Sequence, residues 1–248
     1  MKGSRGHQRA FTLVEMALVL LIIGVLTKAA IAPLAAMQEH GKRKQAEQQL
    51  VTVREAIFAH LVAYGALPCP LPATRSGFVL TAAGNGDNNQ AAICSVSEGY
   101  VSAAQLRFAG AVSDDGAILD PWGRKLRYTV SLNKLEDAGS ASLPYWTTPG
   151  EAAQVGFTQL SADLVLCNSS TTGNCSGRAI RADQIAFVLL STGADSSTKG
   201  GQAENLDADN YFVVAEESIV EHSPFDDLVA WGSAADVMYW MLRMGWLP

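Results

Sequence analysis

The 248-residue sequence lacks the short motifs by which many enzyme families are recognised. It contains no H-E-x-x-H, G-x-S-x-G, G-x-G-x-x-G or P-loop pattern. Only four histidines are present, and neither C-x2-C nor H-x3-H spacing occurs, so a zinc site is not expected. The adjacent carboxylates Asp226 and Asp227 would point to opposite faces of a strand, which argues against a shared-proton pair. We therefore predict that the protein is not an enzyme.

Positive charge is also scarce. The chain has 18 Lys and Arg against 24 Asp and Glu, and a formal net charge of -6. Nucleic-acid binding depends on Lys and Arg that neutralise phosphates, so no nucleic-acid partner is predicted. The exception is the basic segment of residues 1–10, which carries Lys2, Arg5 and Arg9 and no acid. A basic segment directly before an apolar run is typical of targeting sequences.

The apolar run covers residues 11–37, and residues 16–26 are all apolar or glycine. A helix that spans a bilayer needs roughly 20 mostly apolar residues, so this run is long enough. Lys28 lies late in the run, where its side chain can reach the interface. Glu15 is harder to accommodate, because a carboxylate in lipid costs on the order of 2.5–3.5 kcal/mol at the midplane and usually has a partner and a function.

Two interpretations of this run compete. In the first, the run is part of an ordinary secretory signal peptide that is cut near Ala30-Ile31-Ala32, and the mature protein is soluble. In the second, the cut lies between Ala10 and Phe11, and the run is kept as an anchor. Only the second interpretation gives Glu15 a role.

The string F-T-L-V-E at residues 11–15, followed by an apolar helix with Gly24 and Pro33, resembles the N-terminus of type IV prepilins. The resemblance implies that a peptidase removes the basic leader between Ala10 and Phe11 and that Phe11 is N-methylated. It also implies that Glu15 pairs with the freed Phe11 amine of a neighbouring subunit in the membrane. Ala10 stands where the family nearly always has Gly, and Pro33 lies one position later than the usual proline.

The resemblance further implies a structural subunit of a type IV pilus or a type II secretion pseudopilus. Such a subunit crosses the bacterial inner membrane once and places its C-terminal domain in the periplasm. The implied partners are other pilin or pseudopilin subunits, the prepilin peptidase and N-methyltransferase, and an inner-membrane assembly platform. A filament-tip adhesin or ligand-binding minor pilin is the first alternative, since the domain is larger than a minimal pilin needs. A secreted enzyme with a Sec signal is a more distant one.

Periodicity after the apolar run predicts one α+β domain. Apolar residues at three- and four-residue steps predict an amphipathic continuation of the helix over residues 38–65, ended by Gly65 and Pro68, although a break at Gly41 stays open. Ser233 and Asp236 predict the start of a helix over 233–244. We expect a long N-terminal helix, half transmembrane and half amphipathic, packed on an antiparallel sheet in a domain of residues 66–248. Its predicted strands are 126–131, 164–167, 185–191, 211–215 and 228–231.

All four cysteines follow the apolar run. An even number in the downstream domain predicts two disulfides and an oxidising compartment such as the periplasm. Of the possible connectivities we favour Cys69–Cys94 and Cys167–Cys175, because each pair closes a local, turn-rich loop.

Two further stretches are similar to major pseudopilins of type II secretion systems. These are D-P-W-G at 120–123, followed by L-R-Y at 126–128, and S-T-G-A-D at 191–195, leading to D-A-D at 207–209. In those relatives the second stretch is a calcium-binding loop, which implies Asp195, Asp207 and Asp209 as ligands together with backbone carbonyls. The loop here is longer and carries Lys199, and an exposed acidic loop without calcium is the alternative.

Overall fold

A computed structural model describes residues 13–72, 94, 96–133, 144–168, 175, 180–195, 200–207, 209–215 and 225–248. Within the first helix, the side chains of residues 27–36 are outside this description. The chain forms two compact units, residues 1–42 and 43–248.

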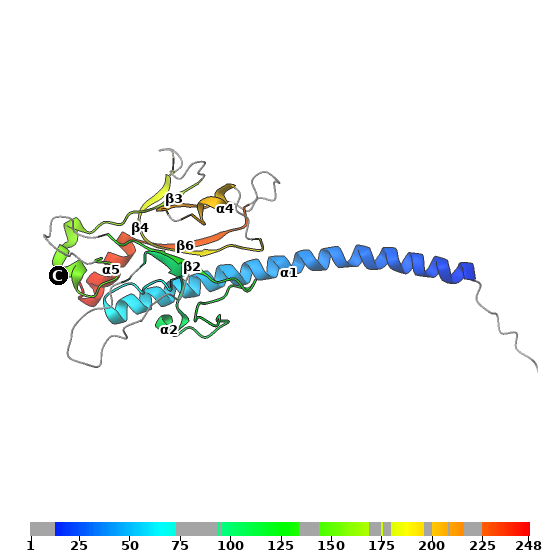
Figure 1. Cartoon of the computed structure of the whole chain (residues 1–248), viewed down its shortest axis with the longest axis horizontal. Helices are drawn as coiled ribbons and strands as arrows, with labels where there is room; N and C mark the ends of the chain where they lie inside the picture. The colour runs from blue at the N-terminus through cyan, green and yellow to red at the C-terminus, as the bar shows by residue number, and fades with distance from the viewer. Residues whose placement is uncertain are drawn as a thin grey trace, which may run out of the picture. The chain divides into compact units, whose positions relative to one another are not determined.

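Helix α1 runs without a break from Leu13 to Tyr64, a length of 52 residues (Figure 1). The predicted long helix is thus confirmed, and it continues through Gly41. It ends at Gly65, which has a φ of +70° and whose N–H donates to the Leu61 carbonyl at 2.8 Å. Glycine is favoured there because a left-handed residue that closes a helix carries no Cβ penalty.

The six-stranded sheet is built around one long strand, β4. β4 pairs antiparallel with β2, β3 and β6, and β1 pairs antiparallel with β2. β5 joins the edge by parallel pairing with β3, so one pair departs from the predicted antiparallel pattern. The strand bounds are β1 Glu98–Tyr100, β2 Arg127–Val130, β3 Leu164–Cys167, β4 Ile180–Ser191, β5 Tyr211–Val213 and β6 Leu228–Ser233.

The main core lies between the sheet and the part of α1 that belongs to the second unit. Figure 1 shows the cyan end of α1 beside β2 and α5. Phe187 of β4 is central, because its ring meets Phe58 edge-on at 5.5 Å and Tyr128 at 6.1 Å between centroids. The fully buried positions of α1 recur every three or four residues, as the sequence pattern predicts. They include Leu50, Val53, Ile57 and Leu61.

Helix α5, Ala234–Met244, closes the same core with Val237 and Met241. The predicted capping box is confirmed: the Ser233 hydroxyl accepts the Asp236 N–H at 3.1 Å, and Asp236 Oδ2 accepts the Ser233 N–H at 3.1 Å.

The second face of the sheet carries a smaller apolar cluster, formed by Leu164, Leu166, Ile185, Val188 and Phe212. Because β4 is covered on both faces, residues 185–191 read as a nearly continuous apolar run rather than an alternating one. The predicted strand of residues 185–191 matches the buried half of β4. The more exposed first half of the strand, which begins at Ile180, was not predicted.

Short elements complete the described chain. They are α2 Ala103–Leu106, α3 Glu151–Val155, the 3-10 turn Phe157–Gln159 and α4 Gly200–Glu204. Before α3 the chain buries Tyr145 and Trp146, and the Trp146 indole donates to the Ser161 carbonyl at 2.8 Å. That bond satisfies the polar edge of an otherwise apolar side chain.

Two disulfides are present, and they join the same cysteines that the sequence analysis favours. Cys69 is bonded to Cys94 and Cys167 to Cys175, with Cα–Cα separations of 5.3 and 5.6 Å. The first pair ties the segment after α1 to the segment that precedes β1, and the second extends from the end of β3.

Candidate functional site

The N-terminal part of α1 places Glu15 in the first helical turn, exposed among apolar neighbours. An acid at this position is favoured by the positive end of the helix dipole. Leu13 is 89% and Leu21 68% exposed, so these side chains have no core of their own to enter. Ala10 and Phe11 lie outside the described residues, and their predicted roles remain predictions.

Among the residues that the structure describes, no helix holds an apolar stretch long enough to cross a membrane.

A second candidate site starts at the D-P-W-G turn. Asp120 is 4% exposed, and its Oδ1 accepts the N–H groups of Trp122 at 2.9 Å and Arg124 at 2.8 Å. Gly123 takes a φ of +81°, which closes the turn that Pro121 begins. The side chain of Asp120 thereby fixes the position of Arg124.

Arg124 reaches from this turn to the loop that follows β4. Its Nη1 donates to the carbonyls of Thr192 at 3.2 Å, Gly193 and Asp195, and its Nη2 donates to the carbonyl of Ala194 at 2.6 Å. One guanidinium therefore contacts four successive carbonyl oxygens.

Asp226 holds the opposite side of the same loop. Its Oδ2 accepts the N–H groups of Ala194 at 2.6 Å and Asp195 at 2.9 Å, and its Oδ1 accepts the side-chain amide of Gln202. Partial burial raises the pKa of Asp226, and the charge of Asp195 adds to this, while the two loop N–H groups and Arg124 oppose it.

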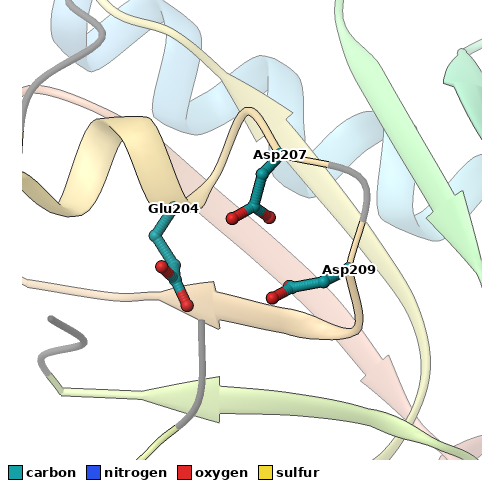
Figure 2. A group of neighbouring side chains, drawn as sticks. All are labelled: Glu204, Asp207 and Asp209. Atoms are coloured by element: carbon teal, nitrogen blue, oxygen red, sulfur yellow. The ribbon is translucent and has the colours of Figure 1, made fainter. Parts of the chain in front are cut away.

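Three acidic side chains lie close together between α4 and β5 (Figure 2). Glu204, at the end of α4, lies with Asp207 and Asp209, and carboxylate oxygens of all three are within 4.8 Å of one another. Burial raises the pKa of Asp209, with added repulsion from Asp207 and Glu204, while the Tyr211 N–H, which Asp209 accepts at 2.8 Å, opposes the rise. We call Glu204, Asp207 and Asp209 the carboxylate group.

The structure brings together two of the three predicted calcium ligands, Asp207 and Asp209. Asp195 does not belong to the carboxylate group, and its Oδ1 instead accepts the Gln202 side-chain amide at 3.2 Å. The third carboxylate beside Asp207 and Asp209 is that of Glu204. Sequence reasoning missed Glu204, although the spacing E-x-x-D-x-D at residues 204–209 was a usable signal because a short turn brings such residues together.

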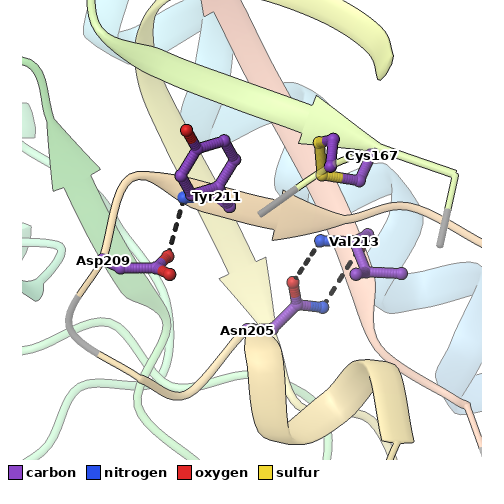
Figure 3. The surroundings of a disulfide bond; sticks show 6 residues. Cys167, Asn205, Asp209, Tyr211 and Val213 are labelled. Carbon is purple, nitrogen blue, oxygen red and sulfur yellow. Dashed lines mark hydrogen bonds between the residues drawn. A yellow bond between two sulfur atoms is a disulfide. The ribbon is translucent and has the colours of Figure 1, made fainter. Parts of the chain in front are cut away.

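Asn205 anchors the carboxylate group to the sheet (Figure 3). Its side chain accepts the Val213 N–H at 2.7 Å and donates to the Val213 carbonyl at 3.1 Å, so it pairs with β5 as a strand would. The same amide donates to Asp227 Oδ2 at 2.8 Å. Val213 packs in turn against Cys167 of the second disulfide. The second disulfide and Asn205 thus fix the position of β5, the strand that directly follows the carboxylate group.

Asp227 is 4% exposed at the start of β6. Burial raises its pKa to about 7, and the charges of Asp226 and Asp195 add to this, while the amides of Asn205 and Gln202 oppose it. The sequence analysis placed Asp226 and Asp227 on a strand, whereas both residues precede β6, which begins at Leu228.

Comparison with known proteins gives one match. Residues 5–27 match the family model described as the prokaryotic N-terminal methylation motif. No curated protein and no solved structure matches the chain.

Proposed function

We propose that this chain, which is a type IV prepilin-like protein, is a structural subunit that assembles through its N-terminal helix into a type IV pilus or a type II secretion pseudopilus. The methylation motif at residues 5–27 carries this proposal. The motif implies processing by a prepilin peptidase and assembly with other pilin subunits, and it indicates a structural protein rather than an enzyme.

The proposed assembly contact joins Glu15 of one subunit to the Phe11 amine of the next. Cleavage before Phe11 creates a positive amine four residues ahead of Glu15. In an apolar environment an unpaired carboxylate is costly, whereas a carboxylate that meets an amine of the adjacent subunit is neutralised. The position of Glu15 in the first turn of α1 supports this, because its side chain is near the end that cleavage would expose.

We further propose that the N-terminal helix is anchored in the bacterial inner membrane and that residues 66–248 lie in the periplasm. The exposed apolar side chains of residues 13–26 support an apolar surrounding for this segment. The two disulfides support an oxidising compartment for the C-terminal domain. The assembly platform of the inner membrane is then the proposed site of insertion into the filament.

The mature N-terminus tests the proposal. We expect intact-mass and N-terminal peptide analysis of the membrane fraction to give a chain that begins with N-methylated Phe11. Ala10→Gly should be cut at least as completely, and Ala10→Arg should accumulate uncut, because the peptidase accepts a small residue there. A mature chain that begins near Pro33 and is released as soluble protein would instead support the secreted alternative.

We also propose that the carboxylate group binds calcium. Three carboxylates within 4.8 Å supply the hard oxygen ligands that Ca²⁺ prefers, and a dication would relieve the repulsion that contributes to the raised pKa of Asp209. Glu204, Asp207 and Asp209 would hold the ion, and the ion would join the end of α4 to the start of β5.

Thermal unfolding of the full chain in detergent, with and without millimolar calcium, tests this second proposal. We expect calcium to raise the Tm of the wild-type chain and of Asp183→Asn, which removes an exposed carboxylate on β4. The rise should be lost in Asp207→Asn. An equal Tm with calcium and with chelator in the wild-type chain would remove the calcium proposal and leave the filament proposal intact.

A further inference from the structure

The loop of residues 192–195 turns its carbonyl oxygens toward one point. In an extended strand successive carbonyls point to alternate sides, so four successive carbonyls meet one group only if the chain turns sharply. Gly193 supplies the turn with a φ of +62°, and a Cβ at this position would lie 2.5 Å from Asp226. The residue is therefore restricted to glycine by both its backbone angle and its neighbour.

The Arg124 guanidinium occupies the point where these carbonyls meet. Its Nη1 carries two hydrogens and contacts three carbonyl oxygens, those of Thr192, Gly193 and Asp195. At least one of these hydrogens is therefore shared between two carbonyl oxygens. The guanidinium acts as a cation surrounded by a cage of carbonyl dipoles and does not make one separate hydrogen bond to each oxygen. The carbonyl of Ala194 meets Nη2 and completes the cage.

The loop is polarised between two opposite charges. The N–H groups of Ala194 and Asp195 point to Asp226, while the carbonyls of the same segment point to Arg124. The peptide dipoles between the two side chains are aligned with the field from cation to anion, which favours this loop conformation. Removing Arg124 leaves the part-buried carbonyls of Thr192 and Gly193 without this donor, and an unpaired polar group away from water costs more than a lost surface contact.

Carbonyl oxygens that converge on one point are also the ligands of Ca²⁺ and other hard cations. An arginine is a covalently attached cation, so a chelator cannot remove it. The Arg124 backbone is held by contacts outside the loop. Its N–H donates to Asp120 Oδ1 at 2.8 Å, and its carbonyl accepts the Asp120 N–H at 2.7 Å.

We propose that Arg124 is the resident cation of the 192–195 carbonyls, so that this loop is ordered without a metal ion and excludes one. Calcium binding by the carboxylate group would use other atoms, since Glu204, Asp207 and Asp209 would bind through their carboxylates and Arg124 contacts the carbonyls of residues 192–195. The inference therefore holds whether or not the carboxylate group takes calcium.

Amide hydrogen exchange of Ala194 and Asp195 in the full chain in detergent tests the proposal. We expect slow exchange in the wild-type chain in the presence of chelator, unchanged by calcium. Arg124→Gln should exchange about tenfold faster or more in chelator, because the loop opens locally. Millimolar methylguanidinium, which restores the missing group, or calcium, which fills the vacated cage, should slow it again.

Two further variants separate this effect from a general loss of folding. Arg107→Gln removes an exposed arginine from the same domain and should leave the exchange of Ala194 unchanged. Arg124→Lys keeps the charge as a point cation and should give intermediate protection. Wild-type amides that lose protection in chelator would overturn the proposal, and so would wild-type protection in Arg124→Gln. If Arg124→Gln does not fold, the wild-type chelator measurement and Arg124→Lys decide the question.

Discussion

The Ser191 hydroxyl donates to Asp120 Oδ2 at 2.7 Å, and both side chains are buried. This bond joins the last residue of β4 to the D-P-W-G turn, 71 residues earlier in the chain. The 192–195 loop therefore starts from a fixed point, and Arg124 approaches it from the same turn. Two stretches that look unrelated in the sequence form one structural unit through this contact.

Asp120→Ala should destabilise the domain strongly. The substitution leaves the N–H groups of Trp122 and Arg124 and the Ser191 hydroxyl without their acceptor. An unpaired buried polar group costs about 1–3 kcal/mol, so we expect a loss of about 3 kcal/mol or more in the free energy of unfolding, measured by denaturant titration. Ser191→Ala is the matched control and should cost about 1 kcal/mol, because it removes one bond of the set. Equal stability of Asp120→Ala and wild type would contradict this account of the turn.

Asp227 should make the domain less stable as the pH rises from about 4 to 7. Burial raises its pKa from 3.8 to about 7, so the folded chain keeps a proton that the unfolded chain releases. The stability that the protonated form contributes is complete below pH 4 and is lost as the pH approaches 7. A pKa unit corresponds to about 1.4 kcal/mol, so the loss is on the order of 4 kcal/mol.

Asp227→Asn isolates this contribution. The variant amide keeps an oxygen that accepts from Asn205 and carries no charge at any pH. We expect the variant to match the wild type near pH 4 and to exceed it by about 2–4 kcal/mol at pH 7–8 in urea unfolding. Carboxylates that do not interact with Asp227 contribute alike to both chains, so the difference between the two curves measures Asp227 together with its charged neighbours Asp226 and Asp195. Parallel curves over this range would show that Asp227 ionises normally.

Strong periodicity made the long elements predictable, and long-range contacts decided the rest. The α1 stripe from Leu50 to Leu61 and the capping box at Ser233 are local patterns, and both are present in the structure. β1 has three residues and depends on pairing with β2, so no local sequence pattern predicts this strand. The parallel pairing of β5 with β3 likewise follows from the tertiary arrangement.

The residues of the candidate site were likewise predictable from the sequence only in part. Asp207 and Asp209 were recognisable from the sequence because they lie two residues apart in a stretch that resembles known pseudopilins. Arg124 was not, because its partners are backbone carbonyls about 70 residues later, and side-chain patterns do not encode carbonyl directions. Asp195 lies outside the carboxylate group, because its loop bends toward Arg124 and Asp226.

Ser233→Ala should weaken the start of α5. The hydroxyl accepts the Asp236 N–H, and its loss leaves a first-turn donor without that acceptor. We expect a loss of about 1 kcal/mol in the free energy of unfolding, measured with denaturant in the full chain. Ser233→Thr retains the hydroxyl and should lose much less, whereas equal losses in the two variants would point to packing at Ser233 instead of capping.

Glu15→Leu should separate anchoring from assembly. Leucine increases the apolar character of the segment, so the variant should enter the membrane fraction at the wild-type level and be cut before Phe11. The variant has no carboxylate to neutralise the Phe11 amine of a neighbouring subunit. A contact worth about 1.4 kcal/mol corresponds to a tenfold change, so we expect filament incorporation to fall by about tenfold or more. Shearing of the filaments followed by immunoblotting measures this. Glu15→Asp keeps the charge on a shorter side chain and should assemble partially. Lys28→Leu removes the other charge of the apolar run and serves as the control for altered hydropathy. Filaments of Glu15→Leu in wild-type amounts would show that assembly depends on contacts other than the Glu15–Phe11 pair.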